Sequence, residues 1–393
     1  KQFNNLNMDF SRVIFEDDYK SIRDSAKSFA SEIVAPRAKQ IDEEDKFFFD
    51  IIKKAGEMGI LGIELPQNEG GAGADAISSV ITTEEIASFS PVVASTIGAM
   101  RTHIMLLNKF GTQDQKKELL PRLVNGEGIA ALGITEPNAG SDLSCLETTA
   151  KRKRDVFILN GSKTYTSFGN ICDFIFVLAY TNKDLGTRNG MTLFIVKTGT
   201  KGLKVGPEEQ KLGLRGMPLV SLTFDNLELE KENILGEEGN GFPQLMNCFD
   251  ATRTDVAAQA IGISKSCLKI CREYSSVRTQ FNRPLIDFQA IQWMLVDMDV
   301  EIAAGRLLMH QAAHLRSQKS RCSREASRAK LFCSDNAMKH ATNAIQILGG
   351  YGYLKSSPIE MLFRDAKVLQ IYDGTNQIQR IILAREISKD EIK

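Results

Sequence analysis

Asp373 is the residue of this chain whose type and surroundings most directly suggest chemistry. It stands in the segment Leu369-Gln-Ile-Tyr-Asp-Gly-Thr-Asn-Gln-Ile-Gln-Arg380, between Tyr372 and Gly374. A positioned carboxylate can act as a general base, and burial beside an apolar group raises its pKa. Such a base would remove a weakly acidic proton from a bound substrate.

The histidines and cysteines are not spaced as the ligands of a metal site. His310 and His314 lie four residues apart on an expected helix, but no third metal ligand is evident. The 7 cysteines are an odd number without zinc-ligand spacing, which favours buried free thiols in a reducing compartment. No metal site is therefore expected.

Composition limits the classes of partner. The 393 residues include 49 basic and 49 acidic side chains, so the formal net charge is zero and no long-range field gathers nucleic acid or an acidic membrane. No stretch reaches the roughly eighteen apolar residues of a membrane span, so no membrane insertion is expected. The N-terminus lacks the apolar core of a signal peptide, and residues 1–7 are interpreted as an extension ahead of a start at Met8. The expected location is the cytoplasm of a bacterium or archaeon, or the mitochondrial matrix of a eukaryote.

The chain divides into three segments with different hydrophobic periodicity, and the fold that they form must position Asp373. Residues 10–128 keep the spacing of helices, residues 129–238 change to short β-rich runs, and the rest of the chain returns to helical spacing. Helices, then a β module, then a helix bundle is an order that fits no doubly wound fold.

Local patterns make the expectation for these segments more specific. Pro36 is predicted to end the first helix, and the glycine-rich run 65–73 is predicted to be a loop. Asn160-Gly161 predicts a hairpin turn after a strand at 156–159. Further strands are predicted at 174–180, 192–196 and 221–224, and a long amphipathic helix is predicted through Phe288, Ile291, Leu295, Met298 and Ile302.

Further segments combine glycines, hydroxyls and charges in motifs: Leu132-Gly-Ile-Thr-Glu-Pro-Asn-Ala-Gly-Ser-Asp142, Phe249-Asp-Ala-Thr-Arg253, Val277-Arg-Thr-Gln-Phe281 and Gln346-Ile-Leu-Gly-Gly350. Together with the segment around Asp373 they resemble the acyl-CoA dehydrogenase family over residues 9–390. The resemblance implies an α+β, mostly α fold with an N-terminal helical domain (9–128), a middle β-barrel-like domain (129–238) and a C-terminal four-helix bundle (239–393), assembled as a homotetramer. It also implies FAD as the cofactor, an acyl-CoA as the substrate, and electron-transfer flavoprotein or a similar acceptor as the partner.

The resemblance also assigns roles to residues. Asp373 would be the catalytic base. The cofactor would contact Leu132, Ile134, Thr135, Gly140, Ser141, Tyr165, Thr166, Ser167, Arg278, Thr279, Gln280, Phe281, Phe288, Gln289, Gln346, Ile347, Leu348, Gly349, Gly350, Thr375, Asn376 and Gln377. The substrate would contact Ser141, Asp250, Arg253, Tyr372 and Gly374. Arg278 would reach the pyrophosphate of FAD across a subunit interface.

Two positions depart from the family pattern. The family often has Trp where this chain has Tyr165, and its base is usually Glu, whereas this chain has Asp373. Asp is shorter by one methylene, about 1.5 Å, and a misplacement of that size can cost on the order of 100-fold in rate. Isovaleryl-type relatives place their base at the position of Thr252, and threonine cannot take that role. The substrate therefore sits closer to the loop, or the abstracted proton lies elsewhere.

The reaction implied is removal of an α-proton by Asp373 and of a β-hydride by the flavin, giving a 2-enoyl-CoA with a cyclic or branched acyl group as one option. A helix at 90–108 would line the acyl pocket, with small Val92, Val93, Ser95, Thr96 and Gly98 and with polar Arg101 and His103 near the end of the tail. The alternatives are a family member with altered chemistry (a cyclic diene-forming dehydrogenase, an acyl-carrier-protein dehydrogenase or a nitroalkane oxidase) and a non-catalytic nucleic-acid-binding relative.

Overall fold

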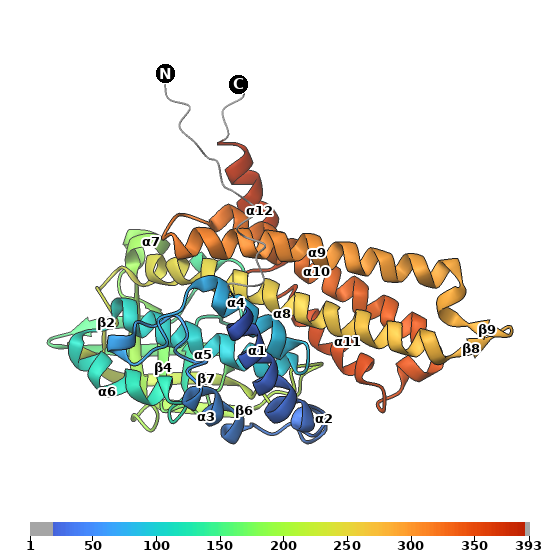
Figure 1. Ribbon diagram of the computed structural model, residues 1–393. Coiled ribbons are helices and arrows are strands. Elements are labelled where there is room, and N and C mark those ends of the chain that lie inside the picture. The colour runs from blue at the N-terminus through green and yellow to red at the C-terminus, as the bar shows by residue number, and fades with distance from the viewer. Residues whose placement is uncertain (1–18, 390–393) are drawn as a thin grey trace.

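A helical N-terminal layer, a curled sheet and a bundle of long helices make up the chain (Figure 1). The structure is a computed structural model that describes residues 19–389, so the extension 1–7 and the start at Met8 lie outside the described residues. The order of the elements confirms the fold class expected from the sequence.

The N-terminal helices are α1 to α6: Lys20–Ser28, Ala35–Glu44, Phe49–Glu57, Ala76–Ala87, Pro91–Phe110 and Gln113–Val124. Pro36 does not end the first helix, contrary to the prediction. A π-helical turn at Phe29–Val34 joins α1 to α2, and Pro36 stands in the first turn of α2, where the N–H that proline lacks is not needed. The glycine-rich run at 65–73 lies between α3 and α4, as predicted.

The sheet contains β1 to β7: Ala130–Gly133, Thr149–Lys153, Val156–Ser167, Phe174–Tyr180, Met191–Lys197, Leu203–Glu208 and Leu219–Glu230. The strand order is β1-β4-β2-β3-β7-β6, and β5 pairs with β4. A short helix, α7 (Gly186–Gly190), precedes β5. Strand β4 coincides with the predicted run at 174–180 and is buried throughout, while β5 and β7 contain the other two predicted runs.

The predicted hairpin at Asn160-Gly161 is wrong. Strand β3 continues through these residues, and the turn lies earlier, at Arg154 and Asp155 between β2 and β3. Gly161 has a φ of +143° and interrupts the register between β3 and β7, so the glycine marks a bulge. A Cβ atom at Gly161 would lie 2.4 Å from the Thr148 hydroxyl, which explains why no side chain fits there.

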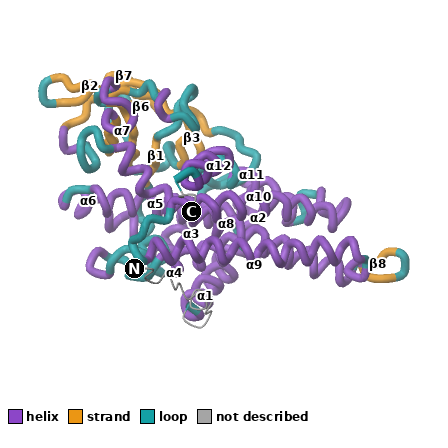
Figure 2. Tube along the Cα trace, turned by 90° about the horizontal axis from the view of Figure 1, so that it is seen from above, coloured by secondary structure: helices purple, strands orange, loops and turns teal. Residues whose placement is uncertain are grey.

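The C-terminal bundle consists of α8 (Gly241–Val277), α9 (Gln289–Ser317) and α10 (Ser323–Leu348), followed by α11 (Pro358–Val368) and α12 (Asn376–Ile387). The predicted amphipathic helix is α9. The small hairpin of β8 (Thr279–Gln280) and β9 (Arg283–Pro284) joins α8 to α9. Figures 1 and 2 both place this hairpin at the end of the bundle away from the seven-stranded sheet.

Helix α4 lies at the centre of the molecule, and all of its residues are buried. It crosses α8 closely at Gly262, where a Cβ atom would lie 2.6 Å from Cβ of Ala87. The fully buried Glu84 carboxylate is bonded by Arg306 at 2.8 Å and lies 3.6 Å from Lys265. These cations hold the pKa of Glu84 at about 2 although burial alone would raise it. Helices α4, α5 and α8 thus form a rigid frame beside the loop that carries Asp373.

Candidate active site

A tight turn between α11 and α12 presents Asp373. Asp373 and Gly374 have φ values of +53° and +84°, two consecutive left-handed residues. Aspartate adopts this region more readily than most side chains because its short polar group can hydrogen-bond locally. Thr375 then caps α12 by accepting a hydrogen bond from Ile378 N at 3.2 Å. The turn and cap fix the direction in which Asp373 leaves the backbone.

The side chain of Lys330, from α10, anchors the carbonyl side of this turn. Its ammonium donates to the Gly374 carbonyl at 2.9 Å and to Oδ1 of Asn376 at 2.7 Å. Gln379 Nε2 donates to the same Gly374 carbonyl at 2.8 Å. By contrast, within residues 19–389 no acceptor is bonded to the backbone N–H of Asp373. The loop therefore offers a rigid carboxylate beside an available amide donor.

The environment of Asp373 raises its pKa. Burial is the main cause and brings the pKa of the carboxyl from 3.8 to about 6, with a further upward contribution from the charge of Asp255. Lys330, Arg253 and a hydrogen bond from the Thr252 hydroxyl act in the opposite direction. Burial also lowers the pKa of Lys330 to about 8. At pH 7 the carboxylate is ionised and close to the pKa at which a general base is most effective.

Asp255 is a second carboxylate that motif reasoning missed. It lies one turn after Thr252 on α8, with an exposed fraction of 14%. Its carboxylate accepts hydrogen bonds from the Thr83 hydroxyl at 2.6 Å and from Gln259 Nε2 at 3.0 Å, and burial raises its pKa. The available signal was the helical spacing, since residues 252 and 255 must share one face of α8.

Gln259 connects Asp255 to Tyr372, the residue before Asp373. Its Oε1 accepts hydrogen bonds from Tyr372 Oη at 2.6 Å and from Ser95 Oγ at 2.8 Å, while its Nε2 donates to Asp255. The ring of Tyr372 is thereby held in place directly before Asp373. One hydrogen-bonded chain thus runs from the base loop through α8 to α5.

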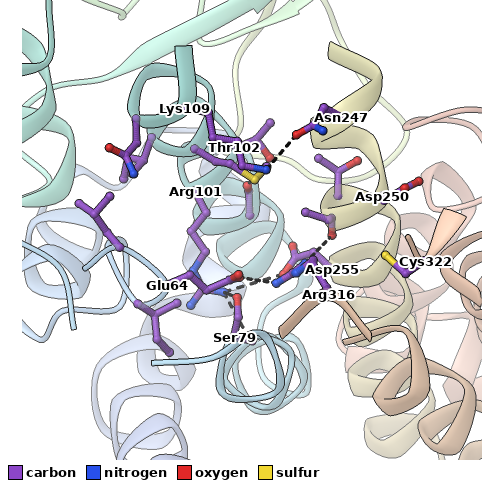
Figure 3. Close-up of a pocket in the computed structure, with 18 of the residues that line it drawn as sticks. Glu64, Ser79, Arg101, Thr102, Lys109, Asn247, Asp250, Asp255, Arg316 and Cys322 are labelled. Carbon is purple, nitrogen blue, oxygen red and sulfur yellow. Dashed lines mark hydrogen bonds and ion pairs between the residues drawn. The ribbon is translucent and has the colours of Figure 1, made fainter. Parts of the chain in front are cut away.

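A cavity of about 840 Å³ opens between α5 and α8. Thr252, whose hydroxyl acts on the pKa of Asp373, lines this cavity, so the cavity borders the surroundings of the candidate base. Figure 3 shows Glu64, Ser79, Arg101, Asp255 and Arg316 gathered at one end, and Lys109 and Asn247 at the other. The lining also includes Asp250, Lys319, Arg321, Cys322 and Ser323, which bring charged and polar groups to its walls.

Two predicted cofactor segments lie side by side in the sheet domain. The loop after β1 and the end of β3 are joined by a hydrogen bond from Thr164 N to the Thr135 carbonyl at 2.8 Å. Tyr165 is 65% exposed and has a left-handed φ of +54°, so its ring stands out from the strand. The buried Thr166 hydroxyl has no hydrogen-bond partner in the described part of the chain. The exposed ring of Tyr165 fits a planar aromatic ligand, whereas the Thr166 hydroxyl points into the protein.

Other predicted cofactor residues belong to the C-terminal bundle: Thr375, Asn376 and Gln377 follow Asp373 at the start of α12, and two further segments lie at the ends of α8 and α10. Arg278 ends α8 just before the hairpin of β8 and β9, and Phe281 lies in the turn of that hairpin. The hairpin is at the end of the bundle away from the seven-stranded sheet (Figures 1 and 2), and Phe281 is 88% exposed. Gly349 and Gly350 follow α10, and a Cβ atom at either would meet no atom within 4 Å. Within one chain, the hairpin residues therefore lie apart from the predicted cofactor residues of the sheet domain.

Sequence models of three domains of one family match the chain: the N-terminal domain of acyl-CoA dehydrogenase at residues 16–127, the middle domain at 131–227 and the C-terminal domain at 239–388. The chain belongs to the acyl-CoA dehydrogenase family. A relative named acyl-CoA dehydrogenase from Bacillus subtilis is 42% identical over 367 residues, covering 93% of this chain and 96% of the relative.

Solved structures of acyl-CoA dehydrogenase relatives agree with this assignment. Butyryl-CoA dehydrogenase from Megasphaera elsdenii is 36% identical with a TM-score of 0.91, covering 95% of this chain and 98% of that chain. The FAD complex of PigA is 26% identical with a TM-score of 0.91, covering 95% and 98% of the two chains. Members of the family are FAD flavoproteins, so this acyl-CoA dehydrogenase relative is an oxidoreductase that uses FAD.

Several residues predicted to contact the cofactor or the substrate have side chains that are buried or hydrogen-bonded within the protein. Asn376 bonds Lys330, Ser334 and Asp335, while Ile347 and Leu348 pack in the core of the bundle. Only the backbones of Ile347 and Leu348 could reach a cofactor. Asp250, a predicted substrate contact, lines the cavity and is bonded by Arg253 at 3.0 Å and Ser323 at 2.5 Å.

The predictions for the acyl pocket and the cysteines are confirmed only in part. Gly98 and Arg101 line the cavity as the acyl-pocket prediction expected, but five other residues of that prediction do not: Val92, Val93, Ser95, Thr96 and His103. All five are buried, His103 against Phe168 and Phe176. All seven cysteines are free, and all are buried except the exposed Cys145, which departs from the prediction of buried thiols. In the described part of the chain, no helix has both the length and the apolarity needed to cross a membrane.

Proposed function

We propose that this chain is an FAD-dependent acyl-CoA dehydrogenase in which Asp373 removes the α-proton of an acyl-CoA and a 2-enoyl-CoA is formed. The observation that carries the proposal is the state of Asp373: a rigid, largely buried carboxylate with a pKa of about 6, beside a cavity large enough for an acyl thioester.

Each step of the proton removal has a candidate group. The ionised Asp373 carboxylate takes the α-proton, and the free backbone N–H of Asp373 can donate to the thioester oxygen as charge develops on it. Lys330 and Arg253 keep the carboxylate ionised at neutral pH in spite of its burial. Bound FAD would supply the acceptor for the hydride that leaves the β-carbon.

The charges along the cavity support a CoA ester as the substrate. Lys319 lines it near Ser323, at the start of α10, and can meet the phosphates of CoA, while Arg321 beside it is paired with Glu386 at 2.6 Å. Asp250 and Arg253 would lie along the thioester arm, with Tyr372 and Gly374 beside the carbonyl and Ser141 approaching from the sheet domain. In this arrangement the reactive carbons face Asp373 and the acyl tail extends between α5 and α8.

The proposed assembly is a homotetramer in which Arg278 reaches the FAD of a neighbouring subunit. The separation of the hairpin from the cofactor residues of the sheet domain within one chain supports this proposal. A stripe of exposed apolar side chains on α9 also supports it: Trp293 (63% exposed), Val296 (57%), Val300 (59%) and Leu307 (48%). Their helical spacing places them on one face, which a second copy of the chain would cover. Electron-transfer flavoprotein or a similar acceptor is the proposed partner that reoxidises the flavin.

The direct test is anaerobic bleaching of the flavin. Purified protein reconstituted with FAD should lose its visible flavin absorbance when mixed with short acyl-CoA thioesters. Nitroethane with oxygen serves as the comparison for altered chemistry, and acyl-carrier-protein thioesters and cyclic acyl-CoAs test the remaining alternatives. Bleaching by nitroethane, with none by any acyl thioester, would overturn the proposal.

A further inference from the structure

One end of the cavity is charged: Glu64, Arg101, Asp255 and Arg316 line it (Figure 3). Arg101, from α5, projects there with an exposed fraction of only 10%. It donates from Nε to the Ile60 carbonyl at 3.0 Å and from Nη1 to the Thr83 hydroxyl at 2.9 Å. The remaining nitrogen, Nη2, is buried and has no hydrogen-bond partner among the described residues. A guanidinium in this state leaves a donor unsatisfied, at a cost in free energy.

Asp255 faces this guanidinium from α8. Its Oδ1 lies 3.8 Å from Arg101 Nη1, so the two charges balance without forming a close bidentate pair. Gly98, one turn before Arg101 on α5, makes room for the carboxylate: a Cβ atom at Gly98 would lie 2.1 Å from Asp255 Oδ2. The two helices therefore approach closely enough at this point to bring both charged groups to the wall of the cavity.

A second ion pair stands beside the first. Arg316 bonds Glu64 in the same end of the cavity, and both residues line it (Figure 3). Each pair is electrically neutral as a unit. A plain alkyl tail placed here would remove water from both pairs without replacing any hydrogen bond, which is unfavourable. A carboxylate would add a third anion beside Asp255 and Glu64, whose guanidinium partners, Arg101 and Arg316, already face a carboxylate each.

We propose that the acyl group of the substrate carries a hydroxyl at its far end, which donates a hydrogen bond to Asp255 and accepts one from Arg101. This inference rests on the proposed function, because it assumes that the cavity receives the acyl tail. A hydroxyl is both donor and acceptor, so it can satisfy the two members of the pair together without altering the charge. The polar end of the cavity thus selects ω-hydroxyacyl thioesters over unsubstituted ones.

The test compares matched thioesters. Butyryl-, pentanoyl- and hexanoyl-CoA and their ω-hydroxy counterparts are each assayed twice, once for the second-order rate of flavin bleaching and once for affinity, from the shift of the flavin spectrum on binding. At the best chain length, the hydroxyl should improve both quantities by about 10- to 100-fold, the range expected for hydrogen bonds to charged groups. Glutaryl-CoA, with a carboxylate at the same end, should be poorer than ω-hydroxypentanoyl-CoA.

Two variants locate the effect. Arg101→Met should reduce the ratio between hydroxylated and plain thioesters to near one. Lys109→Met removes a cation from the opposite end of the same cavity, where it bonds Asn247 at 2.9 Å, and should leave that ratio unchanged. If Arg101→Met does not fold, the wild-type ratios alone decide.

The outcomes separate this inference from the proposed function. If plain acyl-CoAs bleach the flavin and the hydroxyl brings no gain at any chain length, the inference is wrong and the proposed function stands. If no thioester bleaches the flavin but the affinity ratio is present, the proposed function is wrong and the recognition of a hydroxyl stands. A preference for glutaryl-CoA would also overturn the inference, because it would show that the site binds an anion.

Discussion

Flavin reduction by substrate should fall about tenfold between pH 7 and pH 5. Only the ionised form of Asp373 can accept the α-proton, and burial raises the pKa of this carboxyl to about 6. With that pKa, roughly 90% of the carboxyl is ionised at pH 7 and roughly 10% at pH 5. The rate is therefore lost as the pH falls through about 6, well above the value of 3.8 at which an ordinary aspartate would titrate.

The assay is anaerobic stopped-flow absorbance of the flavin at substrate concentrations below saturation, where the second-order rate reports the free enzyme. Lys330→Gln removes a charge that lowers the pKa of Asp373, so the inflection should move to higher pH. Lys339→Gln is the matched control: it changes a lysine on the same helix that bonds Glu301 instead, and its inflection should stay at about 6. A rate that is constant from pH 5 to pH 7 in the wild type would refute the reasoning.

Three further changes test the surrounding structure. Asp373→Asn should raise the free energy of unfolding at pH 7 by about 3 kcal/mol. Folding raises the pKa of Asp373 from 3.8 to about 6, so above pH 6 the charged carboxylate destabilises the native state, and the neutral amide of asparagine removes this cost. Denaturant titrations should show that this gain in stability vanishes below about pH 4, where the carboxyl is protonated in both states. A gain that does not change with pH would contradict the explanation by burial of a charge. Gly262→Ala should lower stability by roughly 1–3 kcal/mol, since its Cβ would lie 2.6 Å from Ala87 and from the Glu84 carbonyl; an unchanged melting temperature would argue against a rigid crossing. Arg278→Ala should release FAD while the circular dichroism spectrum stays the same, and full retention of flavin by the variant would speak against contact across subunits.

Elements with strong local signals could be predicted from the sequence. Strand β4 is apolar at nearly every position because it is buried on both faces, and α9 keeps an unbroken helical spacing. The loop at 65–73 was equally clear because its glycines favour backbone conformations outside helices. The motif around Asp373 indicated both the family and the candidate base.

Features that depend on tertiary contacts could not be predicted in this way. Pro36 lies inside a continuous helical path because a π-helical turn precedes it, and nothing local announces that turn. Gly161 serves a bulge that packs on Thr148 instead of a hairpin. The pairing of Arg101 with Asp255 joins residues 154 positions apart in the sequence, and only the crossing of α5 and α8 brings them together.

The measurement that tests the account most directly is flavin reduction in two single variants, Asp373→Asn and Asp255→Asn. Both replace a largely buried carboxylate beside the cavity with a neutral group of the same size, so they compare the two candidate bases under matched conditions. With the best acyl-CoA at pH 7, Asp373→Asn should reduce the rate by at least roughly 100-fold, as expected for loss of a general base, and Asp255→Asn should reduce it less. If Asp373→Asn reduces its flavin at the wild-type rate while Asp255→Asn does not, the proton leaves to Asp255 and the assignment of the base is wrong.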